Sequence, residues 1–276
     1  MLRHKRILGE RLLVDSRLKK IAAEMQKNSE LEKSMRTARS RQLHMLPKEP
    51  KVAGYEFKSR YMPCANVSGD FFDFIQVSEH EIGIAMGDVS GHGIEAALIM
   101  GMAKKALQIY AKGLSSPKQV LTLTNNDLCH DLDFGTFICA SYGILDIQKR
   151  AFTFCRAGSC PLLLLNPARN PPLLTMKPNG LVIGVDKMGQ QFSSATEEEV
   201  VQIQSGDILF QYTDGLTEAP DVDKSEFGDE GVKRILRKSH DLPAFALLDV
   251  MEEAVQKHIG ALEQQDDITM IVFRVL

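Results

Sequence analysis

The sequence predicts an α+β layered domain preceded by one long helix. Residues 1–44 contain no proline and a single glycine, which is typical of an uninterrupted helix. After two prolines, short runs alternate apolar and polar residues and are broken by Gly, Pro and Asn, as antiparallel strands are. Helical periodicity interrupts these strands in the middle of the chain and again near its end. Elements in this order favour a layered α+β fold.

The first helix carries an apolar seam at heptad spacing. Its apolar positions are Ile7, Val14, Leu18, Ile21, Met25, Leu31 and Met35. They match heptad positions a and d as far as Met25, and Asn28 falls at a further a position, after which the seam shifts. We therefore expect residues 1–44 to form a helical linker that joins two copies of the chain as a coiled coil. A single helix packed on its own domain is the alternative.

The rest of the chain, residues 45–276, is expected to form one domain. Its helices are expected at about 93–112, 116–132 and 243–262. Strands are expected within residues 55–63, 71–77, 81–89, 136–146, 151–158, 161–167, 181–185, 198–216 and 267–275. Pro117 suits the first turn of the second helix.

Charge is divided unevenly along the chain and bears on the choice of partner. Residues 1–41 have a net charge of +7, and the remainder has a net charge of -10. An acidic body suits a bound cation or a protein partner better than nucleic acid. The five cysteines show no Cys-x-x-Cys pair, which argues against disulfides and zinc. No apolar run approaches the roughly 18 residues of a membrane helix, and no signal peptide is evident. We expect a cytoplasmic protein, or the cytoplasmic part of a larger one.

Acidic residues stand beside small residues at the ends of four expected strands. They are Asp70 and Asp73 in "VSGDFFD", Asp88 in "AMGDVSGHG", Asp214 in "LFQYTDGLTEA", and Asp266 and Asp267 in "QQDDITMIVF". A lone Asp at a strand end is usually a turn former. Several carboxylates brought together repel one another unless a cation neutralises them. Mg²⁺ and Mn²⁺ prefer such oxygen ligands, so the pattern predicts a divalent-metal site.

Glycines make the turn at residues 87–93 almost bare of side chains. Glycine beside a carboxylate allows a backbone carbonyl to approach the metal. Gly91 and Gly93 would leave room for an anionic substrate. His92 has two readings, a direct role in proton transfer or phosphate contact, and a turn residue at the rim of the metal site.

Competing motifs are absent or incomplete. The sequence has no Gly-x-x-x-x-Gly-Lys-Ser/Thr phosphate loop and no Gly-x-Ser-x-Gly elbow. The stretch from Asp221 begins like a calcium loop, but Glu226 stands where glycine is needed and Val232 where the bidentate Glu is needed.

In this order the motifs resemble those of the metal-dependent serine/threonine protein phosphatases, the PPM or protein phosphatase 2C-like superfamily. The similar branch is the bacterial one of the sporulation stage II E and Rsb-type stress-response phosphatases. The resemblance runs from Gln42 to Leu276 and includes "QLHMLP", "YMPCANVSGDFFDF", "GDVSGHGIEAALIM", "GTFICASYGILD", "GDILFQYTDGLTEA", "EFGDEGVKRIL" and "QDDITMIV". It implies an αββα sandwich of two antiparallel sheets with two Mn²⁺ or Mg²⁺ ions at one end.

The resemblance also implies roles for individual residues. Asp88 would bridge the two metals, with the Val89 carbonyl as a further ligand, and Asp70 would reach one metal directly or through water. The remaining metal ligands would be Asp214, Asp266 and Asp267. Asp70, Asp88 and Asp214 would be the catalytic residues. Asp73 would lie just outside the ligands.

This sequence departs from the branch in two places and shares with the branch the lack of one arginine. Ser68 stands where the branch usually has glycine before Gly69, and Ser159 in "AGSCP" replaces a frequent histidine. No arginine corresponds to the phosphate-binding arginine that eukaryotic members place before the first Asp, so the metals would carry more of the phosphate charge.

The function implied is hydrolysis of phosphoserine or phosphothreonine by a water that two metals activate. In this branch the substrate is commonly a phosphorylated anti-sigma-factor antagonist of STAS type, acting in stress-response signal transduction. An upstream sensor domain would fit the N-terminal helix. A catalytically silent relative acting as a regulated binding scaffold is the alternative. The acidic body and the motif order argue against a nuclease.

Overall fold

The structure is a computed structural model that describes residues 2–187 and 190–276. Side chains are described from residue 17 onward, except those of residues 18, 22, 188 and 189. The chain divides into two compact units, residues 1–45 and residues 46–276. Each unit is described by itself.

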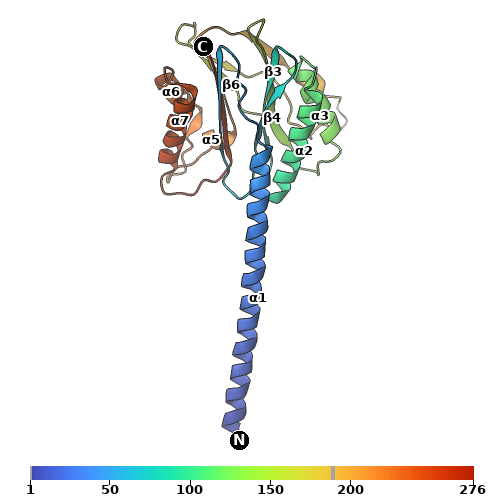
Figure 1. Cartoon of the computed structure of the whole chain (residues 1–276), viewed down its shortest axis with the longest axis vertical. Helices are drawn as coiled ribbons and strands as arrows, with labels where there is room; N and C mark the ends of the chain where they lie inside the picture. The colour runs from blue at the N-terminus through green and yellow to red at the C-terminus, as the bar shows by residue number, and fades with distance from the viewer. Residues whose placement is uncertain (1, 188–189) are drawn as a thin grey trace. The chain divides into compact units, whose positions relative to one another are not determined.

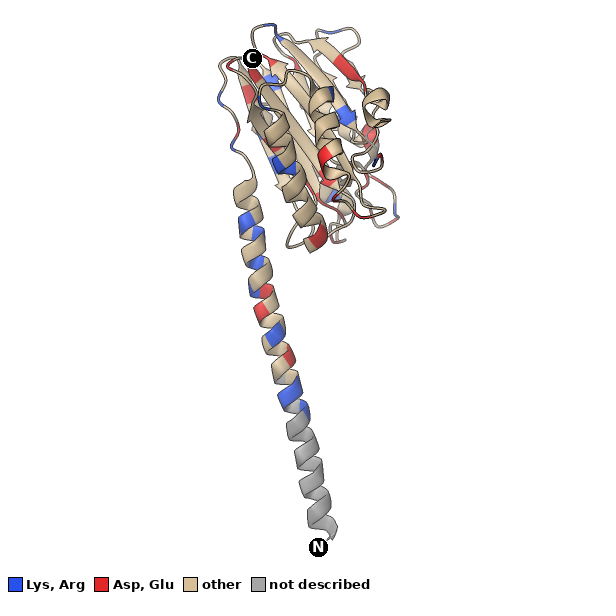
Figure 2. Ribbon diagram, turned by 90° about the vertical axis from the view of Figure 1, so that its right-hand side faces the viewer, with Lys and Arg blue, Asp and Glu red and all other residues tan. Residues whose placement is uncertain are grey.

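The first unit is a single helix, α1 (Leu2–Met45). This confirms the long N-terminal helix, which ends just before Pro47 because proline cannot continue it. Charged residues of both signs follow one another along its described part (Figure 2). No helix in the described part of the chain combines the length and apolar character that a membrane crossing needs.

The apolar seam of α1 lies open in the single chain. Ile21, Met25 and Leu31 are each more than half exposed. The side chains of Ile7, Val14 and Leu18 lie outside the described residues.

The second unit contains two antiparallel sheets. The first sheet has the order β1-β10-β9-β6-β7, and the second sheet has the order β2-β3-β4-β5-β8. The strands of the first sheet are β1 (Tyr55–Met62), β6 (Leu162–Leu165), β7 (Leu173–Met176), β9 (Ile208–Tyr212) and β10 (Ile268–Val275). Those of the second sheet are β2 (Phe71–Gln76), β3 (Glu81–Val89), β4 (Ile138–Asp146), β5 (Ala151–Ala157) and β8 (Glu198–Gln202).

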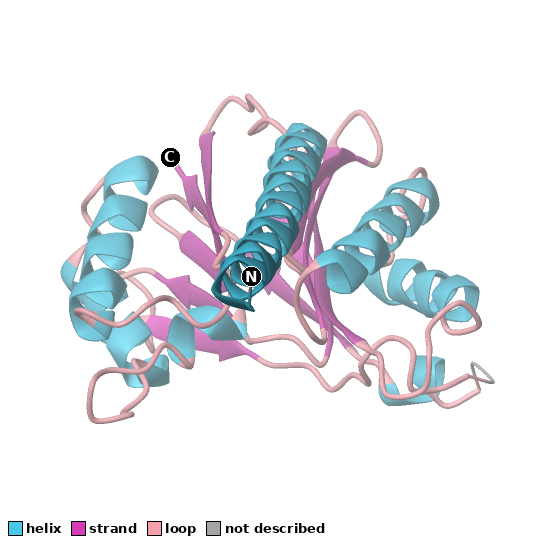
Figure 3. Ribbon diagram, turned by 90° about the horizontal axis from the view of Figure 1, so that it is seen from below, coloured by secondary structure: helices cyan, strands magenta, loops and turns pink. Residues whose placement is uncertain are grey.

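Helices cover the outer faces of both sheets, as Figures 1 and 3 show. The pair α2 (Ile94–Tyr110) and α3 (Pro117–Leu128) covers the second sheet, and the pair α6 (Gly228–Lys238) and α7 (Ala244–Ile259) covers the first. Two short helices are α4 (Phe192–Ala195) and α5 (Asp214–Thr217). The expected αββα sandwich is confirmed.

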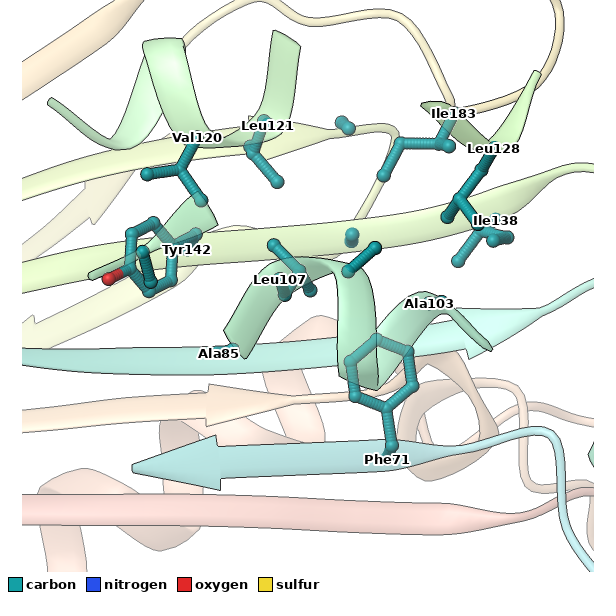
Figure 4. Packing of buried hydrophobic residues seen from close by; sticks show 14 of the residues in the cluster. Phe71, Ala85, Ala103, Leu107, Val120, Leu121, Leu128, Ile138, Tyr142 and Ile183 are labelled. Carbon is teal, nitrogen blue, oxygen red and sulfur yellow. The ribbon is translucent and has the colours of Figure 1, made fainter. Parts of the chain in front are cut away.

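Three apolar clusters hold these layers together, because each sheet buries both of its faces. One lies between the sheets and includes Met86, Phe152 and Phe273. A second packs α2 and α3 on the second sheet, where Phe71 and Leu107 meet (Figure 4). The third packs α6 and α7 on the first sheet. Burying one such side chain contributes about 1.5–3 kcal/mol.

Five elements differ from the sequence expectation, among them the short helices α4 and α5. Residues 181–185 form no strand; only Ile183 makes an isolated bridge, to Ile138. Gly184 has a φ of 98° there, which turns the chain out of the extended path. Strand β7 and helix α6 were not expected. Buried Val232 and Leu236, four residues apart, are the helical signal that could have revealed α6.

Candidate active site

The layer between the sheets changes from apolar to polar toward one end. Side chains alternate along a strand, so the inward series Ile84, Met86 in β3 continues to Asp88. In β9 the inward series from Leu209 continues through Gln211 to Thr213, just after the strand. Strand alternation therefore places the carboxylate of Asp88 at the end of the interior of the sandwich.

Asp70 is buried in this polar end, with 1% of its surface exposed. Its Oδ2 accepts hydrogen bonds from the hydroxyls of Thr213, at 2.9 Å, and Thr269, at 2.6 Å. Its own N–H donates to the hydroxyl of Ser68 at 3.0 Å, so Ser68 supports the turn that carries Asp70. Burial and then the charge of Asp88 raise the pKa of Asp70 well above its ordinary value.

Asp88 lies in the field of four other carboxyl groups. Burial, followed by the charges of Asp214, Asp266 and Asp267, raises the pKa of Asp88 to about 7. The neighbouring side chain of Asp70 acts in the opposite direction and lowers the pKa of Asp88. Five of the six carboxylates that the sequence singled out thus act on one another in one region.

Two glycines allow the turns of this region to pack closely. A Cβ on Gly69 would lie 2.9 Å from the carbonyl oxygen of Val89. A Cβ on Gly215 would lie 2.1 Å from the carbonyl oxygen of Asp267. Both distances are too short for a side chain. The turn before Asp70 therefore lies against the Val89 carbonyl, and the turn after Asp214 against Asp267.

Asp266 and Asp267 differ in their surroundings. Asp267 is buried and accepts hydrogen bonds from the backbone N–H groups of Cys64, at 2.8 Å, and Gly69, at 3.1 Å. Asp266 is exposed, and its Oδ1 accepts the N–H of Asp267 at 2.8 Å. Asp267 therefore anchors the turn that carries Asp70, whereas Asp266 is open to solvent.

The glycine-rich turn after Asp88 requires glycine for its backbone conformation. Gly91 and Gly93 have φ values of 94° and 82°, and a Cβ added to either would meet nothing within 4 Å. Desolvation by neighbouring atoms raises the pKa of Asp266, and the charge of exposed His92 acts weakly in the opposite direction. His92 is therefore near the carboxylates, at their solvent side.

Asp73 lies on the other face of the second sheet. Its Oδ2 is 2.7 Å from the Nζ of Lys104 and accepts a hydrogen bond from Gln108 at 2.6 Å. Lys104 and Gln108 both belong to α2. Asp73 thus ties β2 to α2.

The donor set suits a hard divalent cation, although its spacing is not that of a finished ligand shell. Among residues 2–187 and 190–276, no group of three or more His, Cys, Asp or Glu side chains is arranged to hold a metal ion. Among the residues whose side chains the structure describes, no Lys or Arg forms an ion pair with Asp70, Asp88, Asp214, Asp266 or Asp267. The carboxylate chemistry still favours a cation, since carboxylates with unneutralised charge repel one another when no cation separates them.

A pocket of about 260 Å³ opens beside Asp88 and Asp214. Its other lining residues are Cys139, Arg156, Gly158, Ser159, Cys160, Pro161, Lys177, Thr213, Thr217, Glu218 and Asp229. Thr213 and Thr269 as partners of Asp70, and the two cations of this pocket, were not predicted from the sequence. A threonine directly before Asp214 was the one visible signal.

This two-sheet sandwich, with acidic strand ends at one edge, has the protein phosphatase 2C-type fold. It superposes on the SiaA-PP2C domain of Pseudomonas aeruginosa with a TM-score of 0.77 at 22% sequence identity, covering 90% of this chain and 98% of that one. The model of the Stage II sporulation protein E (SpoIIE) family matches residues 78–276. The chain belongs to this family.

Two curated relatives are longer proteins. Protein IcfG of Synechocystis sp. is 25% identical over 294 residues, which cover 96% of this chain and 45% of that protein. Phosphoserine phosphatase RsbU of Bacillus subtilis is 27% identical over 229 residues, which cover 82% of this chain and 65% of that protein. The chain spans less than two thirds of either relative.

Proposed function

We propose that this protein is a metal-dependent phosphatase that hydrolyses phosphoserine or phosphothreonine on a regulatory protein. One observation carries the proposal: five carboxylates act on one another beside a pocket, and no described Lys or Arg side chain pairs with them. Such a set favours a divalent cation. The named activity of RsbU, a phosphoserine phosphatase, supports the reaction.

Asp88 would bridge two Mn²⁺ or Mg²⁺ ions. The other ligands would be Asp70, Asp214, Asp266, Asp267 and the Val89 carbonyl. When bound, the ions would lower the pKa of a water and stabilise the phosphoryl oxygens. The threonine hydroxyls on Asp70 and the backbone N–H groups on Asp267 would keep these ligands oriented.

No thiol is needed as a nucleophile in this reaction. Burial, helped by nearby carboxylates, raises the pKa of both Cys64 and Cys139 to about 12. A thiol with such a pKa is protonated at neutral pH and is a poor nucleophile.

The substrate class follows the SpoIIE/Rsb relatives. We propose a phosphorylated anti-sigma-factor antagonist of STAS type as the substrate and stress-response signalling in the cytoplasm as the setting. An upstream sensor domain would supply the signal. These assignments rest on family membership.

We also propose that residues 1–44 dimerise the chain and that residues 45–276 are the phosphatase domain. The exposure of Ile21, Met25 and Leu31 supports a second helix against this seam. Asn28 at an a position would favour two strands in register.

Hydrolysis of p-nitrophenyl phosphate with added Mn²⁺ tests the reaction. Wild type should be active, EDTA should stop turnover, and Mn²⁺ should restore it. Asp88→Asn should fall below about a tenth of the wild-type rate, a barrier change above ~1.4 kcal/mol. Asp241→Asn changes an exposed aspartate outside the site and should remain active. A folded wild type that binds Mn²⁺ without hydrolysing any phosphomonoester would support the scaffold alternative instead.

A further inference from the structure

The pocket beside the carboxylates has a cationic part that the proposed metal ligands do not explain. Arg156 stands near the end of β5, and Lys177 follows β7 directly. Both line the same pocket as Asp88 and Asp214. Arg156 is half-buried, and Lys177 is exposed at the pocket's edge.

The guanidinium of Arg156 is held in a fixed position. Its Nε donates to the carbonyl oxygen of Pro178 at 2.8 Å, and its Nη1 donates to the carbonyl oxygen of Ser159. An arginine has five N–H donors in a planar fork, so three remain after these two bonds. The anchors lie in two different segments that border the pocket, which orients the fork before any ligand arrives.

The backbone around Arg156 reinforces this position. A Cβ on Gly180 would lie 1.8 Å from the carbonyl oxygen of Arg156. Only glycine permits so close a crossing of the two segments. The segment that carries Lys177 therefore passes directly over Arg156, and both cations belong to one wall of the pocket.

The charge of Arg156 is left available to a ligand. In the described part of the chain no carboxylate forms an ion pair with Arg156 or Lys177. The charges of Asp88, Asp214 and Arg156 all act on the pKa of the Cys139 thiol, so these three side chains surround the same group. Asp229, also in the pocket, is engaged by the hydroxyl of Tyr212 at 2.9 Å. A fixed, unpaired guanidinium near a metal-binding group is suited to an anion.

The size of the pocket limits that anion. Pockets for drug-sized molecules measure roughly 300–1,000 Å³, whereas this pocket measures about 260 Å³. A phosphorylated serine or threonine side chain fits such a space better than a whole nucleotide. The guanidinium fork matches phosphoryl oxygens in pairs.

We propose that Arg156 binds the phosphoryl group of the substrate, and that Lys177 adds positive charge at the pocket's edge. This inference rests on the proposed phosphatase function and assigns the phosphate contact to β5, not to a residue before Asp70. Arg156 would hold oxygens of the group while water attacks phosphorus, and it would not exchange a proton because arginine stays charged.

The test compares Arg156→Lys and Lys177→Gln with wild type in Mn²⁺, using p-nitrophenyl phosphate as substrate and inorganic phosphate as inhibitor. Arg156→Lys should weaken phosphate inhibition and raise KM by about tenfold, the loss of one hydrogen bond between charged groups. Lys177→Gln should have a smaller effect in the same direction. The Mn²⁺ concentration for half-maximal activity and the thermal midpoint should stay unchanged. Arg274→Gln is the matched control, because Arg274 also donates to a backbone carbonyl, that of His240, from the far end of β10.

Unchanged phosphate inhibition in a folded Arg156→Lys variant would overturn the inference. If Arg156→Lys shifted the Mn²⁺ requirement but left phosphate inhibition unchanged, the inference would also be overturned. Arg156 would then only support the structure of the pocket wall. If wild type hydrolyses nothing, calorimetry with inorganic phosphate and Mn²⁺ still decides. In that case the proposed function fails, but weaker phosphate binding by Arg156→Lys than by wild type would still support the inference. Equal phosphate binding by the two proteins would refute the inference as well.

Discussion

At the scale of single residues, folding brings the carboxyl groups of Asp70 and Asp88 close enough to shift each other's pKa. Both have raised pKa values, because burial and neighbouring negative charge disfavour their ionised forms. Ionising them in the folded, metal-free protein therefore costs stability. This cost is the residue-level reason to expect a cation.

The stability of metal-free protein should fall as pH rises. The pKa of Asp88 is raised from 3.8 to about 7 on folding, so between these values the folded state binds more protons than the unfolded state. Stability then decreases with pH across this window, and the penalty is complete above pH 7. Urea unfolding in EDTA at several pH values measures this trend. Asp88→Asn should flatten the curve, and a wild-type curve that rises from pH 4 to pH 7 would refute the assignment.

At the scale of elements, one buried ion pair connects α2 to β2. The side chains of Lys104 and Asp73 are each 4% exposed and lie 2.7 Å apart. Lys104 also donates to the carbonyl oxygen of Phe72 at 2.8 Å. The pair fixes the helix that follows the glycine turn against the strand that follows Asp70.

Lys104→Met should destabilise the domain by about 3–5 kcal/mol, because it leaves the Asp73 carboxylate buried without its cation. The double variant Lys104→Met, Asp73→Asn should recover much of this loss. Urea denaturation of both single variants and the double variant gives the coupling. Lys105→Met, at an exposed position of the same helix, is the control. A loss below about 1 kcal/mol for Lys104→Met would show that the pair is unimportant.

The sequence predicted most elements because periodicity and turn residues are local signals. The glycine turn, the start of α3 at Pro117 and the last strand all follow such signals. A strand was expected at residues 181–185 because the residues around Gly184 are apolar. No strand forms there, because Gly184 has a positive φ and turns the chain. The threonines on Asp70 and the position of Arg156 depend on pairing between distant strands, which no local pattern encodes.

At the scale of the whole molecule, the open question is how many copies of the chain act together. Ile21 is 52% exposed and Met25 is 68% exposed in one copy of α1. Burying these residues against a second copy would remove apolar surface from water. We expect a dimer formed through α1.

Ile21→Asp and deletion of residues 1–40 should both give monomers in analytical ultracentrifugation, because each removes the seam. Ser29→Asp, at an exposed polar position of α1, should leave the dimer intact. Phosphatase assays on the same samples show whether α1 also controls activity. If it does, we expect a coupling free energy of ~1–3 kcal/mol between dimerisation and activity. Full activity in the monomers would show that α1 dimerises the chain without controlling activity. Variants that remain dimeric would refute the coiled coil.

The central claim is that the carboxylates around Asp88 are a divalent-metal site. Titration calorimetry with Mn²⁺ at neutral pH tests it without any substrate. Wild type should bind about two ions per chain, as two-metal hydrolases do, and Asp88→Asn should lose at least one of them. Wild type that binds no Mn²⁺, or Asp88→Asn that binds it as wild type does, would contradict the account.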